Sequence, residues 1–387
     1  MRSSDRKLRI LLITDQHFFP SREGLSTVMT ELAMYLPAQR LICLTGLKTA
    51  YFPPTNDRSV SITSLFDEGN KWGKIIELIR MVLSLKLRLN PDIIIVDSCW
   101  SGNIALMLGK LLCVPTVMLA HGNEILQLRD KTWQKQYLSL KNAAKIVAIS
   151  NYTKDLLVDT GLPEEQIKVL HLGADPDVFY PMTFQEVEKK KEDLGLREKL
   201  VLMTVGNLFL RKGQDMVIKA LPGILKKFPD LVYLLVGKGR DENYLRELAA
   251  SLGIEENVRF LGVIEDWNRL RELYNICDIY IMTSRLQLKE GSVENFGIAF
   301  VEANACGRPV IGGRSGGVPE AIIDGKTGLL VDPENVGDIQ KTIISLLENP
   351  SWAAKLGQNG RRRVETDLNW KKVGEKLESI CREVLDS

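Results

Sequence analysis

The chain has 387 residues, of which 45% are apolar and 26% are charged. This length is enough for two domains with full hydrophobic cores, and the composition excludes an intrinsically disordered protein. The 51 basic and 49 acidic residues leave a formal net charge of +2, so the bulk charge indicates no nucleic-acid partner.

Short apolar runs alternate with helix-length segments, a pattern that predicts parallel sheets covered by helices. The first series of predicted strands comprises 8–14, 40–46, 91–97, 115–120, 145–150 and 167–173. The second series comprises 199–206, 231–237, 257–262, 277–284, 308–313 and 327–332. Between the two series, the prolines and charges of 173–195 mark a linker.

The predicted fold class is therefore α/β, with two Rossmann-like domains facing across a cleft. We expect 1–178 to form the first domain and 179–366 the second, with the C-terminal helix 367–387 packing back on the first. Ligands of open α/β sheets bind beyond the carboxyl ends of the strands. Candidate residues directly after predicted strands include Gly24, His121, Asn151, Gly206, Arg211, Lys212, Gly237, Gly239 and Gly316.

The cysteines show no Cys-x-x-Cys spacing, and most lie in apolar runs, so we expect buried thiols in a reducing compartment. They are Cys43, Cys99, Cys113, Cys277, Cys306 and Cys381. The N-terminal apolar run stops at Asp15, short of a signal peptide, and no segment approaches 18 apolar residues. A cytoplasmic protein is expected.

Two carboxylates, Glu294 and Glu302, lie on either side of "NFGIAFV". Glycosidases place two carboxylates about 5 to 9.5 Å apart across one bond. If the segment is helical from Gly297 onward, eight residues span roughly 12 Å of the axis and leave the acids about 80° apart around it. This spacing favours contact with two ends of one elongated ligand over hydrolysis of a single bond.

Two cations, Arg211 and Lys212, lie in "TVGNLFLRKGQD", between a strand that ends at Gly206 and a helix that begins near Gly213. Cations at a helix N-terminus oppose the helix dipole, and a bound diphosphate would remove that cost. Solvated charges on a loop are an equally good interpretation of this segment taken alone.

Other features also allow two interpretations. Gly316 and Gly317, before Pro319, suit either a tight turn or the close approach of a ligand. His121 opens "HGNE" directly after an apolar strand, a position that favours a functional over a structural histidine.

Asp175 and Asp177 resemble an Asp-x-Asp metal site, but their place in the linker indicates a turn cap, and we expect no metal site. The helix 71–89 carries five basic residues and one acid, Glu77, as a helix on an anionic membrane does. The favoured interpretation is a crossover helix that buries a broad apolar face on its sheet.

Taken together, these motifs resemble the retaining family 4 glycosyltransferases of the GT-B fold. The resemblance rests on Glu-x7-Glu followed by "ACGRPVIGG", "GGVPEAI" and "DGKTGLLVDP". It extends over almost the whole chain through the phosphate loop "TVGNLFLRKGQD", the base-binding strands "LVGKGR" and "VRFLG", and the hinge segment "HLGADPDVFYP".

The resemblance implies a metal-independent transfer of a hexosyl unit from a nucleoside-diphosphate sugar, with retention at the anomeric carbon. Glu302 would hold the ribose hydroxyls, Glu294 the donor sugar, and His121 would lie beside the transferred sugar. Arg211 and Lys212 would neutralise the diphosphate. Further implied donor-binding residues are Gly24, Gly206, Asn207, Gly237, Val263, Phe296, Gly297 and Ile298.

The chain departs from the family pattern at three positions. Asn207 replaces a common arginine, so Arg211 must carry more of the phosphate contact; Glu23 and Asn295 replace common glycines. The first domain would bind the acceptor and the second the nucleotide sugar.

We expect no metal and no cofactor besides the donor. As the nucleotide of the donor, UDP is expected ahead of GDP. The acceptor would be a sugar, a lipid-linked glycan or a polysaccharide, and the segment 46–70 carries no pattern that identifies it. A contact of 71–89 with lipid would place the protein at the inner face of the membrane. The alternatives are nucleotide-sugar epimerisation or hydrolysis, and a non-catalytic GT-B protein that binds a partner.

Overall fold

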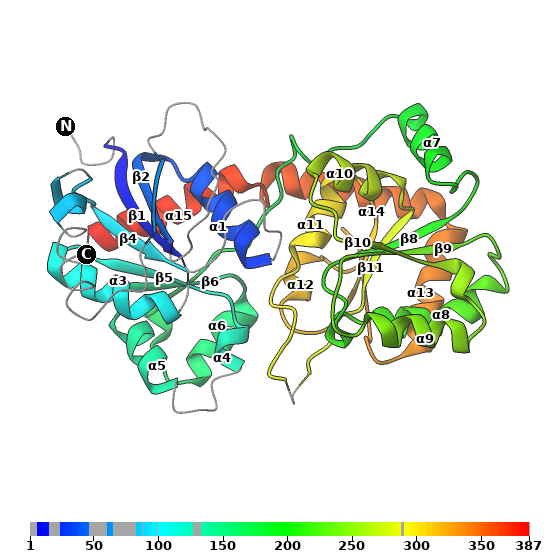
Figure 1. Cartoon of the computed structure of the whole chain (residues 1–387), viewed down its shortest axis with the longest axis horizontal. Coiled ribbons are helices and arrows are strands. Elements are labelled where there is room, and N and C mark those ends of the chain that lie inside the picture. The colour runs from blue at the N-terminus through cyan, green and yellow to red at the C-terminus, as the bar shows by residue number, and fades with distance from the viewer. Residues whose placement is uncertain are drawn as a thin grey trace. The chain divides into compact units, whose positions relative to one another are not determined.

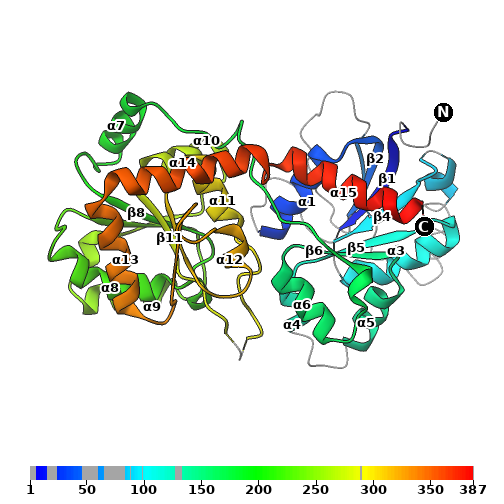
Figure 2. The ribbon, with the colours of Figure 1, turned by 180° about the vertical axis from the view of Figure 1, so that it is seen from behind.

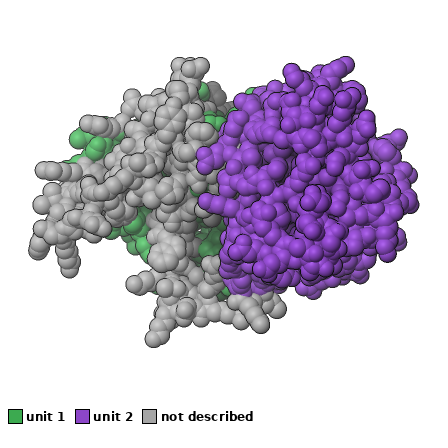
Figure 3. Space-filling model, turned by 45° about the vertical axis from the view of Figure 1, so that its right-hand side comes forward, with its two compact units in different colours: residues 1–170, 370–387 green, residues 171–369 purple. Residues whose placement is uncertain are grey.

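The computed structural model describes residues 6–14, 24–45, 60–64, 83–87, 89–97, 99–126, 133–287 and 290–386. The chain divides into two compact units (Figure 3). Unit 1 comprises 1–170 and 370–387, and unit 2 comprises 171–369. Each unit contains one parallel sheet with helices packed on it, which confirms the predicted α/β class with two Rossmann-like domains.

Unit 1 is built on a seven-stranded sheet of order β3-β2-β1-β4-β5-β6-β7 (Figure 1). Its strands are β1 (Leu8–Thr14), β2 (Ala38–Thr45), β3 (Val60–Ser64), β4 (Ile93–Val96), β5 (Thr116–Ala120), β6 (Lys145–Ala148) and β7 (Ile167–Val169). The central strands are nearly continuous apolar runs because both faces of a parallel sheet are covered. All six strands predicted for this unit are present. β3 lies in the segment 46–70, where the sequence predicts no strand.

The C-terminal helix packs on unit 1 beside α1 (Figure 2). Besides the helical segment 83–87, the helices in the described part of this unit are α1 (Gly24–Tyr35), α3 (Cys99–Leu112), α4 (Asn123–Leu126), α5 (Trp133–Asn142), α6 (Asn151–Asp159) and α15 (Trp370–Leu385). A Cβ on Gly374 would lie 2.4 Å from the carbonyl oxygen of Tyr35, so α15 can approach α1 this closely only with glycine at that position. The Arg382 guanidinium donates to the carbonyl of Arg6 at 2.8 Å and ties the end of α15 to the start of β1.

Gly374→Ala should therefore loosen the packing of α15 on α1. We expect the free energy of unfolding in urea to fall by about 1 to 3 kcal/mol, the usual cost of an extra methyl group in a tightly packed contact. The matched control is Gly337→Ala on another helix, where the added Cβ meets only the side-chain oxygen of Asn335, at 3.3 Å. Equal stability of the two variants would contradict this account of the helix pair.

Unit 2 is built on a six-stranded sheet of order β10-β9-β8-β11-β12-β13. Its strands are β8 (Val201–Val205), β9 (Val232–Val236), β10 (Val258–Gly262), β11 (Ile279–Met282), β12 (Val310–Gly313) and β13 (Leu329–Val331). Its helices are α7 (Phe184–Asp193), α8 (Gln214–Leu225), α9 (Glu242–Ser251), α10 (Trp267–Ile276), α11 (Ile298–Ala305), α12 (Val318–Ala321), α13 (Val336–Glu348) and α14 (Pro350–Thr366). All six predicted strands are present, and the order reverses between β8 and β11, where a doubly wound sheet opens for ligands.

The units divide after Leu170 and after Asn369, whereas we expected boundaries after 178 and 366. The segment that follows β7 folds with unit 2 because α14 holds it. Arg361 donates to the carbonyls of Pro176 and Phe179 at 3.2 and 2.7 Å. The predicted linker 173–195 therefore belongs to unit 2, and within it α7 is an ordered helix that starts with a Thr183–Glu186 capping box.

The cysteine prediction needs one correction. Cys277, Cys306 and Cys381 are buried free thiols, as predicted, and burial raises the pKa of Cys277 and of Cys381 to about 12. Cys113 is exposed instead, because it follows α3 in a turn at a φ of 57°. Nothing is described of the side chains of Cys43 and Cys99.

The predicted helix 71–89 lies mostly outside the described residues. Its described part, 83–87, is helical. Leu85 and Leu89 are buried, as a crossover helix requires, whereas Leu83 and Leu87 are exposed. None of the helices in the described ranges is long and apolar enough to cross a membrane.

Candidate donor-binding site

Three neighbouring strands of unit 2 end in glycines whose backbones lie against one another. The Gly206 N–H donates to Val236, and the Gly237 N–H donates to Gly262, at 2.9 and 2.8 Å. A Cβ on Gly237 would lie 2.1 Å from the Gly206 carbonyl oxygen, so the loops after β8 and β9 touch. Val263, which follows Gly262, is 45% exposed. Three of the predicted donor-binding residues thus share one edge of the sheet.

The two predicted cations lie on a short 3-10 turn, Leu210–Lys212, between β8 and α8. The turn ends at Gly213, which has a φ of 80° and serves as the N-cap of α8. A Cβ on Gly213 would lie 2.0 Å from the carbonyl oxygen of Thr283. Glycine is required here on both counts, and it brings the turn against the loop that follows β11.

Lys212 and Arg211 both pair with Glu294, the first of the two predicted acids. Lys212 Nζ donates to Glu294 Oε2, and Arg211 Nη1 lies 3.6 Å from the same oxygen. The three side chains are only 13 to 15% exposed. The structure therefore supplies an anion at the N-terminus of α8, and that anion is a carboxylate of the same chain.

Burial and charge act in opposite directions on this pair. Burial lowers the pKa of Lys212, and Glu294 only partly opposes that effect. Burial alone would raise the pKa of Glu294, but Lys212 and Arg211 outweigh it, so the pKa lies below its ordinary value. The carboxylate of Glu294 is therefore ionised at neutral pH and compensates the buried cations.

The backbone of Glu294 is held by the glycine pair that precedes α12. The Gly317 N–H donates to the Glu294 carbonyl at 2.9 Å. Gly316 has a φ of 57°, and a Cβ there would lie 2.3 Å from the same carbonyl oxygen. The positive φ and close packing of Gly316 fit a tight turn, and this turn fixes the backbone of Glu294. Pro319 lies in the first turn of α12, as predicted.

Glu302, the second predicted acid, lies on α11 and is only 7% exposed. Its Oε2 accepts a hydrogen bond of 2.6 Å from the hydroxyl of Tyr274. The helical spacing that we expected between the two acids is wrong, because α11 begins at Ile298, after Gly297 in the left-handed region, and Glu294 lies in the loop before it. The two acids are therefore on different elements. Glu294 lies in the loop before α11, next to the cation turn at the N-terminus of α8, and Glu302 lies on α11 itself.

Phe296 lies in the same loop and is buried against the first residue of unit 2. Its ring stacks on His171 with centroids 5.5 Å apart and planes at 18°. His171 Nε2 in turn lies 2.8 Å from Glu320 Oε2 on α12. The implied donor-binding residues Phe296 and Gly297 therefore belong to a loop that is packed in place, and Ile298 begins α11 directly after it.

Two site residues, Arg285 and Asp215, escaped the sequence analysis. The Arg285 guanidinium donates to both carboxylate oxygens of Asp215, on α8, at 2.9 and 3.1 Å. The Arg285 N–H also donates to the carbonyl of Arg211 at 2.8 Å. Arg285 thus clamps the cation turn to the loop after β11. No sequence signal identifies this pair, because its members are 70 positions apart and each resembles a surface charge.

Two predicted site residues, His121 and Gly24, belong to unit 1. His121 follows β5, is 7% exposed, and its N–H donates to the carboxylate of Glu124 at 2.6 Å. Gly24 is the first residue of α1. Glu23, which precedes it, lies outside the described residues.

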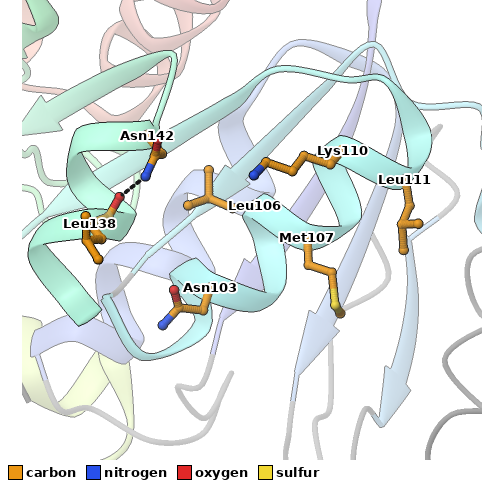
Figure 4. A pocket seen from close by; sticks show the side chains of 7 residues that line it. All are labelled: Asn103, Leu106, Met107, Lys110, Leu111, Leu138 and Asn142. Carbon is orange, nitrogen blue, oxygen red and sulfur yellow. Dashed lines mark hydrogen bonds between the residues drawn. The ribbon is translucent and has the colours of Figure 1, made fainter. Parts of the chain in front are cut away.

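Unit 1 also contains a pocket of about 460 Å³ between α3 and α5 (Figure 4). Its walls are mainly apolar, Lys110 is the one charged side chain that lines it, and no predicted site residue does. The lining residues are Asn103, Leu106, Met107, Lys110, Leu111, Leu138 and Asn142.

The Asp-x-Asp segment forms a turn, as predicted. Asp175 Oδ1 accepts from the N–H of Asp177 at 2.8 Å, and the Asp175 carbonyl accepts from Phe179 at the same distance. Among the side chains that the structure describes, no group of three or more His, Cys, Asp or Glu could hold a metal ion.

Comparison with known proteins identifies the family. The profile described as "Glycosyl transferases group 1" matches residues 186–363, and "Glycosyltransferase Family 4" matches residues 22–178. The GDP-mannose-dependent alpha-(1-6)-phosphatidylinositol monomannoside mannosyltransferase of Mycolicibacterium smegmatis is 33% identical over 265 residues, which are 68% of this chain and 69% of that protein. The GDP-mannose-dependent monoacylated alpha-(1-6)-phosphatidylinositol monomannoside mannosyltransferase of Corynebacterium glutamicum is 33% identical over 301 residues, 74% of this chain and 76% of that protein.

The fold is also found in solved structures. Anabaena Alr3699/HepE in complex with UDP and glucose has the same fold, with a TM-score of 0.77 and 19% identity over 97% of this chain and 99% of that one. The chain belongs to the family 4 glycosyltransferases. The predictions of a GT-B fold and of a glycosyltransferase are confirmed.

Gly213→Ala should disrupt the cation turn. The variant combines the strain of a left-handed alanine, about 1 to 3 kcal/mol, with a clash against the Thr283 backbone. Gly253→Ala is the matched control, because Gly253 has a φ of 67° and open space around it. Thermal unfolding should show a larger loss for Gly213→Ala than for Gly253→Ala, and nucleotide binding should weaken in Gly213→Ala alone. Equal effects on both properties would refute the packing role of Gly213.

Glu294→Gln should destabilise the protein in a pH-dependent way. A carboxylate whose folded-state pKa is lowered stabilises the fold above its unfolded pKa of about 4.3, and this contribution is lost as the pH falls through the folded-state value. At pH 7 we expect a loss of about 3 to 5 kcal/mol, because Lys212 loses its buried partner. Urea unfolding at a series of pH values should show that the difference in the free energy of unfolding between wild type and Glu294→Gln shrinks below about pH 4.3. A gap that is constant with pH would show that the charge of Glu294 is not involved.

Proposed function

We propose that this chain transfers a mannosyl unit from GDP-mannose to a lipid-linked acceptor, with retention at the anomeric carbon and without a metal ion. The observation that carries the proposal is the buried cluster of Arg211, Lys212 and Glu294, with Glu302 on the neighbouring helix. The choice of donor rests on the relatives from Mycolicibacterium and Corynebacterium, which are GDP-mannose-dependent. They favour GDP over UDP, which we had ranked first.

The cluster is suited to exchange one anion for another. In this structure Glu294 neutralises Lys212 and Arg211. A diphosphate carries more charge than one carboxylate, so it would displace Glu294 from the two cations. The displaced carboxylate would then accept hydrogen bonds from hydroxyls of the donor sugar, and Glu302 would accept them from the ribose.

Catalysis would come mainly from electrostatics. As the bond between the anomeric carbon and the diphosphate breaks, negative charge grows on the leaving phosphate, and Arg211 and Lys212 are placed to stabilise it. The departing phosphate oxygen would take the proton of the acceptor hydroxyl on the same face of the sugar, which gives retention. The two cations would balance the charge of the diphosphate without a divalent ion.

His121 would lie beside the transferred sugar. Its backbone is fixed by Glu124 and its side chain is mostly buried, so it would orient the sugar and exclude water at the reacting carbon. A lipid-linked acceptor would require the enzyme to work at the inner face of the membrane. The predicted basic helix 71–89 is the candidate for that contact, and co-sedimentation with anionic but not neutral liposomes would support it.

Release of GDP from GDP-mannose should occur in the presence of a chelator and require a lipid extract as acceptor. We expect Glu302→Ala to lower donor affinity by about 10- to 150-fold, the loss for a hydrogen bond to a charged group. Glu247→Ala, on the exposed face of α9, is the control that should match wild type.

UDP- and ADP-sugars should be poor substrates in the same assay, and the product should be the α-mannoside. Activity with UDP-glucose in place of GDP-mannose would refute the donor assignment. Loss of activity with chelator, restored by a divalent ion, would refute metal independence.

A further inference from the structure

We propose that Tyr274 is a positioning residue that sets the orientation of Glu302 for the ribose of the donor. The inference rests on the proposed function, because it assigns to Tyr274 a role in the affinity for the two ribose hydroxyls. Nothing in the sequence indicates this role, since Tyr274 lies between apolar residues in "ELYNICD" and is indistinguishable there from a core residue.

The contact itself joins two buried side chains. Tyr274 is 0% exposed and Glu302 is 7% exposed, and the hydroxyl donates to Glu302 Oε2 at 2.6 Å. Burial, and then the charge of Glu302, raises the pKa of Tyr274 well above its ordinary value. The hydroxyl is therefore protonated at neutral pH and acts as the donor, while Glu302 accepts.

Aromatic packing holds the Tyr274 ring in one place. Phe179 meets it edge-on with centroids 5.7 Å apart and planes at 82°, and Tyr280 lies 5.7 Å away on another side. Tyr280 in turn packs edge-on against Phe300 of α11, the helix that carries Glu302. The Tyr274 hydroxyl is thus a fixed point relative to the backbone of α11.

A fixed donor on one oxygen restricts the carboxylate to one rotamer and one plane. A glutamate on a helix has three rotatable side-chain bonds, and ordering them on ligand binding lowers affinity. With Tyr274 in place, that order exists before the nucleotide arrives. Removal of the hydroxyl should therefore weaken only the part of the affinity that comes from the ribose hydroxyls.

The same aromatic layer provides a matched control in Tyr280. This tyrosine is also fully buried, but its hydroxyl donates to the carbonyl of Val205 at 3.2 Å and not to Glu302. Tyr280→Phe and Tyr274→Phe each remove one buried hydroxyl from neighbouring rings. A general loss of packing would affect both variants alike, whereas a role in positioning Glu302 belongs to Tyr274.

The test compares the dissociation constants of GDP and 2′,3′-dideoxy-GDP for each variant by calorimetry. Wild type should prefer GDP by about 10- to 150-fold, the contribution of hydrogen bonds to a charged group. Tyr274→Phe should reduce this preference about tenfold and leave the affinity for dideoxy-GDP unchanged. Tyr280→Phe should keep the full preference. Glu302→Gln should largely abolish this preference. The double variant Tyr274→Phe with Glu302→Gln should show the same preference as Glu302→Gln alone.

Each other result overturns a defined part of the account. If Tyr274→Phe kept the wild-type preference while Glu302→Gln lost it, the positioning role would be wrong and the proposed function would stand. If Tyr274→Phe weakened both nucleotides equally, its role would be general packing. If wild type bound neither nucleotide, the donor assignment and this inference would both fail.

Discussion

The buried ion pair between Lys212 and Glu294 is the interaction on which the rest of the site depends. A lysine this deep is costly to bury alone, and a helix N-terminus beside it adds to the cost. Glu294 offsets part of both penalties. The pair therefore holds two cations at the point where we propose that a diphosphate binds. It also keeps Glu294, the carboxylate that we propose contacts the donor sugar, within reach of the same point.

The surrounding structure explains how such a pair is maintained. Gly213 lets the cation turn contact the loop after β11, and Gly316 lets the turn before α12 hold the backbone of Glu294. Arg285 joins the two sides through Asp215 and the carbonyl of Arg211. These contacts join three separate loops at the carboxyl ends of neighbouring strands, so the position of each charge is set by backbone packing and not by the ion pair alone.

The sequence predicts what local chemistry determines. Twelve strands follow from apolar runs, and the cations, glycines and acids of the site follow from their places after strands and from the family resemblance. It does not predict contacts between distant residues that look ordinary in their own segments, such as Tyr274 with Glu302 or Arg285 with Asp215. The helical spacing of the two acids failed because one positive φ, at Gly297, starts the helix after Glu294. The prediction that Cys113 is buried failed for a similar reason. Its positive φ places it in a turn, which ends the apolar run that suggests burial.

The most direct test of the anion exchange is a crystal structure of the protein with GDP. The measured quantity is the distance from Lys212 Nζ to the nearest phosphate oxygen and to Glu294 Oε2. The exchange predicts a direct contact of about 2.7 to 2.9 Å with phosphate, with Glu294 moved away and turned toward the space that the sugar would fill. Lys212 still paired with Glu294 in the complex, with the diphosphate bound elsewhere, would contradict the account.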